Sequence, residues 1–195
     1  MKNKEFYELI EGDIFVRDSS VRNVEFEKYS KKWFRHIKRN SISMYFNRNE
    51  KIFRLTCWYR VKQNYSSRNS FIGMMGRFMY RKYNRKYQTI IGTANIGMGL
   101  HIVHDSNAFI NANMIGKYCT IFQNVTIGVD GKGGKPTIGN HVRIYSNAVI
   151  CGNIRVGDRC IIGANAFVNR DLPDDSVVIN NCTIVKRRTI SNKNE

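Results

Sequence analysis

The sequence predicts a mainly β fold, in which the chain winds into a β-helix of hexapeptide repeats after a small α-helical region. An aliphatic residue returns at every sixth position from Ile138 to Val168, and the same period begins upstream at Phe109. A period of six fits neither an α-helix nor simple strand alternation, whereas a fixed short repeat is typical of a solenoid. The residues predicted to fill the lumen are Phe109, Ile115, Ile121, Ile127, Ile138, Ile144, Ile150, Val156, Ile162 and Val168.

Small residues accompany this period on both sides. A glycine follows many of the aliphatic residues, as in Ile115-Gly116 and Ile138-Gly139. Compact side chains stand two positions before several of these aliphatic residues, at Cys119, Ala148, Cys160 and Ala166. Bulky groups would not fit where the chain turns a corner, and glycine adopts corner dihedral angles at little cost. We therefore expect the glycines to mark the corners of the coils.

The period slips once, between Ile127 and Ile138, where the spacing is eleven residues. Residues 129–137 contain three glycines and two lysines, which cannot continue a packed lumen. This segment is predicted to be a loop, and in solenoids such loops often build the binding surface. Lys132 and Lys135 are accordingly candidate substrate-binding residues. A tolerated insertion without a role is the alternative.

Two helices are expected before the repeats. Asn49-Glu50 is a typical helix start, and the following residues 52–61 have a broad apolar face. Ser70 precedes a second apolar segment that ends in basic residues near Lys86. Gly73 and Gly76 within it each disfavour a helix by about 1 kcal/mol, which suggests close packing against a neighbour.

Charge is distributed unevenly along the chain. The formal net charge is +17, and residues 28–86 contain 17 basic residues against the single acid Glu50. No nucleic-acid-binding motif accompanies these charges, so we expect no nucleic-acid partner. Peripheral contact with an anionic membrane through residues 28–86, an acidic sugar or lipid-diphosphate acceptor, and an ordinary solvated surface remain open. No apolar run approaches the roughly 18 residues that span a bilayer.

The cysteines and the first residues bear on the cellular compartment. The five cysteines form no Cys-x-x-Cys pair, and several occupy compact repeat positions. We therefore expect buried thiols in a reducing compartment, with neither disulfides nor a metal site. The first residues lack the apolar core of a signal peptide. A cytoplasmic protein is predicted, with membrane association on the cytoplasmic face as an extension.

Four segments together resemble the hexapeptide acyltransferases, and most closely the branch similar to serine acetyltransferase. This branch includes the O-acetyltransferases of bacterial capsule and exopolysaccharide synthesis. The resemblance covers roughly residues 89–188 and implies a left-handed parallel β-helix. It also implies a homotrimer, acetyl-CoA as the donor, and active sites between neighbouring subunits. The segments that carry it are Ile96–His104, Ile121–Gly128, the glycine-rich loop and Ile162–Asp174.

The domain division follows from these observations. We expect a basic α-helical N-terminal domain at residues 1–88 and the acyltransferase β-helix, with its loop at 129–137, at residues 89–185. A basic tail occupies residues 186–195.

Transfer of an acetyl group to a hydroxyl needs a base that removes the hydroxyl proton, and histidine titrates in the suitable range. His36 lies in a cationic run, and His141 follows a predicted corner. The resemblance assigns the catalytic role to His104, which stands five residues after the Gly-x-Gly at 97–99. His101 is expected to lie on the coil surface nearby.

The donor and acceptor residues are carried over from the resemblance by position. Ser146, Ala164, Asn169 and Arg170 are predicted to line the acetyl-CoA groove, and Arg187 to meet a CoA phosphate. Guanidinium groups suit that task because they bind phosphate in a bidentate manner. Asn124 replaces a common glycine near the acetyl end and is a candidate substrate-binding residue.

The sequence departs from the family pattern at three places, and the last of them bears on the acceptor. Thr89 stands fifteen residues before His104, where relatives carry a carboxylate that orients the histidine. Tyr145 stands where relatives usually have glycine. The loop reads Gly133-Gly-Lys-Pro136, without the Arg-His pair that grips serine in serine acetyltransferases.

We therefore predict a sugar or surface-polysaccharide O-acetyltransferase. Serine O-acetyltransferase of cysteine biosynthesis is the alternative, and a non-catalytic β-helix scaffold is the contrasting class. A γ-type carbonic anhydrase, which shares the architecture, would need a different spacing of its histidines.

Overall fold

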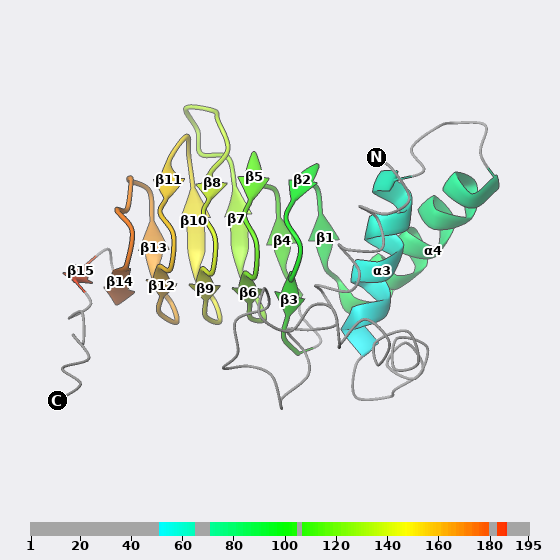
Figure 1. Cartoon of the computed structure of the whole chain (residues 1–195), viewed down its shortest axis with the longest axis horizontal. Coiled ribbons are helices and arrows are strands. Elements are labelled where there is room, and N and C mark those ends of the chain that lie inside the picture. The colour runs from blue at the N-terminus through cyan, green and yellow to red at the C-terminus, as the bar shows by residue number, and fades with distance from the viewer. Residues whose placement is uncertain (1–50, 65–70, 105–106, 180–182, 187–195) are drawn as a thin grey trace, which may run out of the picture.

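The structure of the protein is a computed structural model, and its described residues form two helices followed by a β-helix (Figure 1). Helix α3 spans Lys51–Asn64 and helix α4 spans Phe71–Tyr87, so the two predicted helices are confirmed. Their predicted first residues, Asn49 and Ser70, lie outside the described residues. The structure describes residues 51–64, 71–104, 107–179 and 183–186.

The β-helix has three faces, each a parallel sheet whose strands come from successive coils (Figure 1). Sheet A contains β1 (Ile90–Ile91), β4 (Phe109–Ile110), β7 (Thr126–Gly128), β10 (Val149–Cys151) and β13 (Phe167–Val168). Sheet B contains β2 (Asn95–Ile96), β5 (Met114–Ile115), β8 (Thr137–Ile138) and β11 (Arg155–Val156). Sheet C contains β3 (His101–Ile102), β6 (Thr120–Ile121), β9 (Arg143–Ile144), β12 (Ile161–Ile162), β14 (Ser176–Ile179) and, antiparallel at its end, β15 (Thr183–Lys186).

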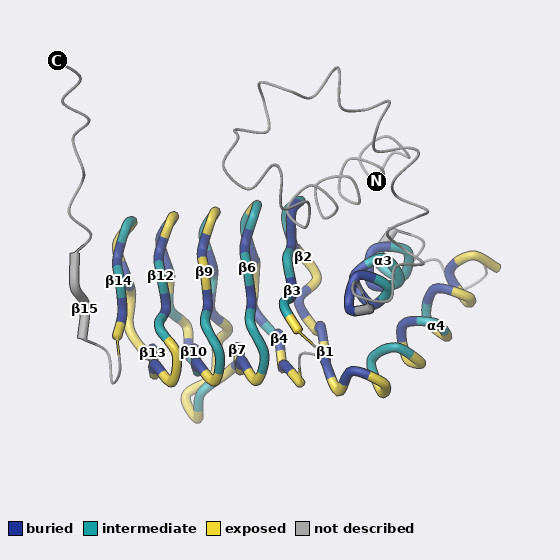
Figure 2. The backbone as a smooth tube through the Cα atoms, turned by 90° about the horizontal axis from the view of Figure 1, so that it is seen from below, coloured by how far each residue is buried: buried dark blue, intermediate teal, exposed yellow. Residues whose placement is uncertain are grey.

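The lumen is filled as the repeat predicts, with one correction. The aliphatic residues from Ile138 to Val168 that recur at every sixth position are completely buried, and Figure 2 shows buried positions alternating with exposed ones along each coil. Phe109, however, is 41% exposed, and its neighbour Ile110 is buried instead. The prediction for Phe109 is wrong because successive strand residues face opposite sides. The buried residues Ile110 and Ile115 are only five positions apart, because the corner between β4 and β5 is one residue shorter than the six-residue period requires.

The corner glycines have a different physical reason from the one expected. Positive φ angles at the corners belong mostly to other residues, including Tyr118 at 57° and His141 at 56°. Gly97, Gly116 and Gly139 instead stack on successive coils, where a Cβ atom on Gly116 would lie 2.5 Å from the carbonyl oxygen of Gly139. The repeat therefore needs these glycines because the coils approach closely, not because of their dihedral angles.

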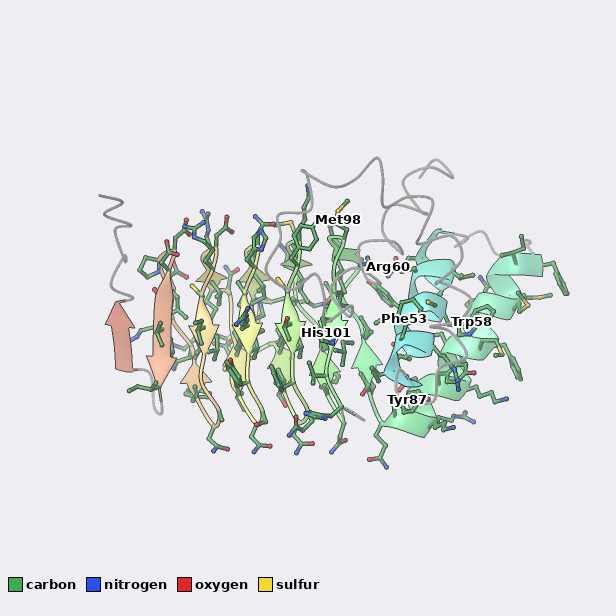
Figure 3. The ribbon with its side chains drawn as sticks, turned by 60° about the horizontal axis from the view of Figure 1, so that its bottom comes forward. Phe53, Trp58, Arg60, Tyr87, Met98 and His101 are labelled. Carbon is green, nitrogen blue, oxygen red and sulfur yellow. The ribbon has the colours of Figure 1, made fainter. Side chains whose placement is uncertain are left out.

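The helices cover the first end of the β-helix. Tyr59 of α3 donates a hydrogen bond to the carbonyl oxygen of Thr93. The buried Arg60 donates to the carbonyl oxygens of Ile96 and Gly97, both at 2.6 Å, and lies between α3 and the first coil in Figure 3. Tyr80 of α4 exchanges hydrogen bonds with the backbone of Ile91. These contacts satisfy polar backbone groups that the first coil would otherwise leave without a neighbouring coil.

The predicted glycine-rich loop leaves the β-helix between β7 and β8 and projects from it (Figure 1). Residues 129–136 form this connection, and Thr137 already belongs to β8. The loop folds back on the next coil, and Gly134 lies directly against Asn153. A Cβ atom added to Gly134 would lie only 2.5 Å from the Cβ atom of Asn153. Its shape is therefore tied to the coil below it.

Candidate functional site

The corners between the three sheets form three edges of the β-helix. We call them the C–A edge (residues 103–104, 107–108, 122–125, 145–148 and 163–166), the A–B edge (92–94, 111–113, 129–136, 152–154 and 169–171) and the B–C edge (97–100, 116–119, 139–142, 157–160 and 173–175). Each edge is a ladder, because equivalent corners of successive coils stack.

His104 lies on the C–A edge, in the first coil, and is exposed. Its ring is 6.2 Å from the ring of Phe122, on the next coil, at an angle of 53°. Phe122 in turn stacks on Tyr145, one coil further, at 4.8 Å and 18°. His104 therefore stands at the end of an aromatic row that follows the edge. Phe122 was missed in the sequence, although its position eighteen residues after His104 suggests the same corner.

The backbone at His104 is left-handed, with φ of 63°. Asn124, Asn147 and Asn165 have φ of 58°, 61° and 59° at equivalent corners of the following coils. Asparagine tolerates this conformation better than most residues, so the fold itself accounts for Asn124 at its position. A substrate-binding role for Asn124, which is exposed on the same edge as His104, stays a prediction.

Thr89 does not act as a substitute for the missing carboxylate. It is completely buried, its hydroxyl donates to the carbonyl oxygen of Tyr87 at 3.0 Å, and it accepts from the amide of Ala108 at 3.4 Å. Thr89 thus fixes the start of the β-helix to the end of the corner that carries His104.

The predicted donor residues divide between two edges. Ser146 and Ala164 lie on the C–A edge with His104, on successive coils, and the carbonyl oxygen of Ser146 accepts from the amide of Asn165 at 3.0 Å. Asn169 and Arg170 follow β13 on the A–B edge and are exposed.

The A–B edge also carries the loop with the predicted substrate-binding residues. Lys132 and Lys135 are both exposed there. Arg187, the last predicted donor residue, lies outside the described residues. Sheet A separates the two groups within one chain, so a single subunit does not gather the predicted site.

The remaining histidines lie elsewhere. His101 is half-buried on the outer face of sheet C, in register with Thr120 (Figure 3). His141 is exposed on the B–C edge and stacks on Tyr118 at 5.2 Å. His36 lies outside the described residues. Within the described part of the chain, no group of three or more His, Cys, Asp or Glu residues could hold a metal ion.

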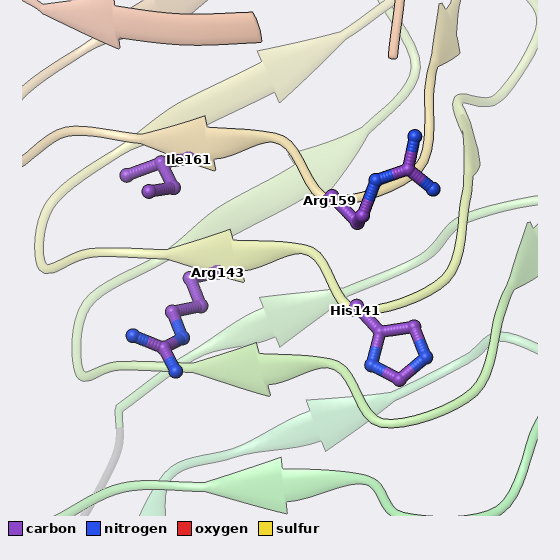
Figure 4. Close-up of a pocket in the computed structure, with 4 residues that line it drawn as sticks. All are labelled: His141, Arg143, Arg159 and Ile161. Carbon is purple, nitrogen blue, oxygen red and sulfur yellow. The ribbon is translucent and has the colours of Figure 1, made fainter. Parts of the chain in front are cut away.

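A shallow pocket opens beside the B–C edge and contains none of the predicted site residues (Figure 4). It is lined by His141, Arg143, Arg159 and Ile161. Arg159 is engaged there by Asp175, to which it donates two hydrogen bonds of 2.7 Å. These contacts raise the pKa of Arg159 above its ordinary value. The side chains of Arg159 and Asp175 are 49% and 46% exposed, so the pocket borders a surface ion pair, away from His104.

Comparison with known proteins agrees with the β-helical fold. Residues 135–170 match the family model described as bacterial transferase hexapeptide (six repeats). Serine acetyltransferases of Synechococcus elongatus and Helicobacter pylori are 40% and 44% identical over 90 residues, or 44% of this chain. The chain spans about half or less of these relatives, since the matches cover 37% and 53% of their lengths.

Solved structures resemble nearly the whole chain. A serine acetyltransferase in complex with CoA has a TM-score of 0.68 at 23% identity, covering 94% of this chain and 71% of the other. The Neisseria gonorrhoeae serine acetyltransferase has a TM-score of 0.63 at 23% identity, with 94% and 68% covered. The predicted resemblance is confirmed. The β-helix resembles that of hexapeptide-repeat acyltransferases of the serine acetyltransferase type.

Proposed function

We propose that the protein is an O-acetyltransferase that uses acetyl-CoA and in which His104 is the general base. The observation that carries this proposal is the exposed position of His104 on the edge that also presents Ser146 and Ala164. The imidazole accepts the proton of the acceptor hydroxyl while the hydroxyl oxygen attacks the carbonyl carbon of the thioester. The same proton then neutralises the departing CoA thiolate. The relatives that match are enzymes of this reaction class by name.

The site is proposed to form between copies of the chain in a homotrimer. The outer face of sheet A is apolar, with Ile90, Phe109 and Phe167 at 46%, 41% and 42% exposure. Burial of this face toward a three-fold axis would stabilise the assembly. It would also bring the C–A edge of one copy beside the A–B edge of the next. His104, Ser146 and Ala164 would then face the loop, Asn169 and Arg170 of a neighbour across one groove.

The comparisons favour serine as the acceptor over a sugar. The similar proteins named above are serine acetyltransferases, and none of them is named as a polysaccharide enzyme. Serine O-acetylation, the alternative drawn from the sequence, is therefore the first proposal for the acceptor. The proposed acceptor residues Asn124, Lys132 and Lys135 would then bind the amino acid.

A sugar hydroxyl is the second candidate, and two observations favour it. The exposed loop reads Gly133-Gly-Lys-Pro136, so the Arg-His pair that would grip serine is absent from this loop. The stacked rings of Phe122 and Tyr145 beside His104 form an aromatic surface of the kind that packs against the apolar face of a ring-shaped acceptor.

An assay of CoA release separates the two acceptors. Full-length protein with acetyl-CoA is tested against free serine, nucleotide sugars and capsule oligosaccharides, with His104→Ala as the control for background hydrolysis. Release stimulated by serine alone would exclude the sugar. Release with sugars alone would exclude serine. Stimulation by none of these acceptors, together with no binding of CoA, would support a non-catalytic scaffold.

A cytoplasmic location is also proposed. It rests on Cys119, Cys151 and Cys160, which are free thiols. Burial raises the pKa of Cys119 to about 12, consistent with a structural thiol that packs in the lumen. In the described ranges, no helix has the length and apolarity that crossing a membrane requires.

A further inference from the structure

Helix α4 carries a continuous apolar surface on one side. Phe71 and Phe78 are 74% and 67% exposed, and Met74 is 56% exposed. Ile72 and Met75 between them are 44% and 40% exposed. Their spacing of three, four and seven residues places them on one face of the helix. Exposed apolar side chains that gather in this way mark an interaction surface.

The opposite face of α4 is already used inside the protein. Gly73, Gly76, Tyr80 and Tyr87 are buried. A Cβ atom on Gly76 would lie 2.9 Å from a side-chain carbon of Val61 in α3, so the two helices touch closely. In Figure 2, exposed positions follow the outer side of α4, at the end of the molecule. The packing of α4 on α3 therefore fixes which side of the helix is presented.

Basic side chains continue the same face along the last two turns. Arg81, Lys82, Arg85 and Lys86 are exposed, and α4 contains no acidic residue. At 100° per residue, Lys82 and Arg85 fall in line with Phe71 and Phe78. We call these nine residues the α4 outer face: Phe71, Ile72, Met74, Met75, Phe78, Arg81, Lys82, Arg85 and Lys86.

We propose that the α4 outer face docks on the surface of an anionic lipid bilayer. Apolar side chains of a surface helix enter the boundary between head groups and acyl chains, while cations remain at the level of the lipid phosphates. Each Lys or Arg near such a surface adds to the attraction. The segregation on α4, apolar in the first turns and basic in the last, supplies both contributions on one face.

Charge argues for lipid rather than for a second copy of the chain. Two α4 outer faces paired in parallel would set four cations of one beside four like charges of the other, and paired antiparallel they would set those cations against the apolar turns of the other helix. An anionic bilayer instead complements them. The inference does not depend on the proposed acetyl transfer. Docking would, however, hold the coil with His104 near the bilayer, because the helices cap that coil through Tyr59 and Tyr80.

Vesicle co-sedimentation of the full-length protein tests the proposal. Vesicles of phosphatidylcholine with phosphatidylglycerol are compared with pure phosphatidylcholine, at low and high salt. We expect binding to the anionic vesicles that falls with salt. The double variant Phe71→Ser, Phe78→Ser should lower the partition coefficient at least about 10-fold. Lys82→Gln with Arg85→Gln should lower it about 30-fold at low salt, since each cation contributes about 1 kcal/mol.

Matched changes elsewhere keep the test specific. Ile179→Ser removes an apolar side chain that is 47% exposed at the far end of the β-helix, and Arg143→Gln removes an exposed cation from sheet C. Both should bind vesicles as the wild type does. Equal losses in these controls, equal binding to neutral vesicles, or no binding by the wild type would each overturn the proposal. A fall in oligomer mass of the Phe71→Ser, Phe78→Ser variant without loss of vesicle binding would show an interface between copies instead.

Discussion

The C–A and B–C edges have the same construction but different internal bonding. Each places a histidine in a left-handed corner, with φ of 63° at His104 and 56° at His141, and each sets an aromatic ring beside it. On the B–C edge, polar side chains bond to the coil before them. The amide of Asn140 donates to Asp158 at 2.8 Å, and the amide of Asp158 donates to Asp174 at 2.9 Å.

The C–A edge presents different corner residues. Its corners after β9 and β12 carry the small residues Ser146 and Ala164, which leave room for an extended ligand along the coils. A histidine in a strained corner is therefore a product of the fold and does not by itself indicate catalysis. The surroundings of each edge distinguish a site from a structural ladder. The predictions below test this distinction.

The largest expected difference separates the two histidines. His104→Ala should lower acetyl transfer at least about 100-fold, because a positioned base contributes that much. His141→Ala should leave the rate within about 2-fold, because its ring packs on Tyr118 at an edge that holds no predicted donor residue. Steady-state rates on the same acceptor, with circular dichroism to verify folding, measure both. If both variants lose acetyl-transfer activity to a similar extent, the distinction between the C–A and B–C edges is contradicted.

A smaller effect is expected for the donor. Arg170→Ala should raise the KM for acetyl-CoA about 10-fold, the usual contribution of a hydrogen bond to a charged phosphate, and leave the acceptor KM unchanged. Arg187→Ala should do the same if the resemblance assigns it correctly. Arg143→Ala, on sheet C, is the matched control. A donor KM unaltered in both variants would contradict the assignment of these arginines to CoA.

Much of the fold could be predicted because the lumen imposes its period directly on the chain. The residues from Ile138 to Val168 show this, and the loop was recognised because it breaks the period. Phe109 shows the limit. The strand and its approximate place were predicted, but a corner one residue shorter than the period moves the buried residue to Ile110. No spacing rule reveals such a shortening before the neighbouring coil is in place.

The site was predictable only in part, for a related reason. The resemblance assigns roles to His104, Ser146 and Arg170, but a match along the sequence does not say on which edge of the β-helix each residue lies. Neither could it reveal Arg60, whose guanidinium is buried against the carbonyl oxygens of the first coil. A buried arginine in a basic helix looks like one more surface charge until the coil it covers is known.

The structural role of the B–C edge can be tested through stability. Asp158→Ala removes an acceptor of hydrogen bonds from Asn140 and should destabilise the protein by about 1 kcal/mol. Ser146→Ala, on the C–A edge, should change stability by less. Midpoints of urea unfolding at neutral pH measure the two effects. An equal loss at both edges would contradict the assignment of this hydrogen-bonded ladder to the B–C edge rather than the C–A edge.

The same carboxylate predicts a pH dependence. Hydrogen bonds from Asn140 hold the pKa of Asp158 below its ordinary value of 3.8. A lowered folded-state pKa adds stability that is complete above the unfolded pKa and is lost as the pH falls through the folded pKa. The wild type should therefore lose more stability than Asp158→Asn below about pH 4. If the free energies of unfolding of the two proteins fall by the same amount across that pH range, this role of Asp158 is contradicted.

The smallest expected effect concerns the aromatic row beside His104. Tyr145→Gly removes the ring that stacks on Phe122 at 4.8 Å and restores the residue usual in relatives. An aromatic contact contributes about 0.5–1.5 kcal/mol, so the acceptor KM should rise about 2- to 10-fold if the row binds a ring-shaped acceptor. The donor KM should not change. Tyr118→Gly, which removes the stack on His141 at the other edge, is the matched control.

The outcome for Tyr145 sharpens the choice of acceptor. If the KM for a sugar rises in Tyr145→Gly and does not rise in Tyr118→Gly, recognition of the sugar ring belongs to the C–A edge and not to the B–C edge. With serine as the active acceptor, the aromatic row has no ring to bind, and a lower or unchanged KM for serine is expected because glycine widens the groove. A rise in the donor KM instead would mean that Tyr145 contacts the pantetheine arm. The aromatic row would then belong to the donor side of the groove.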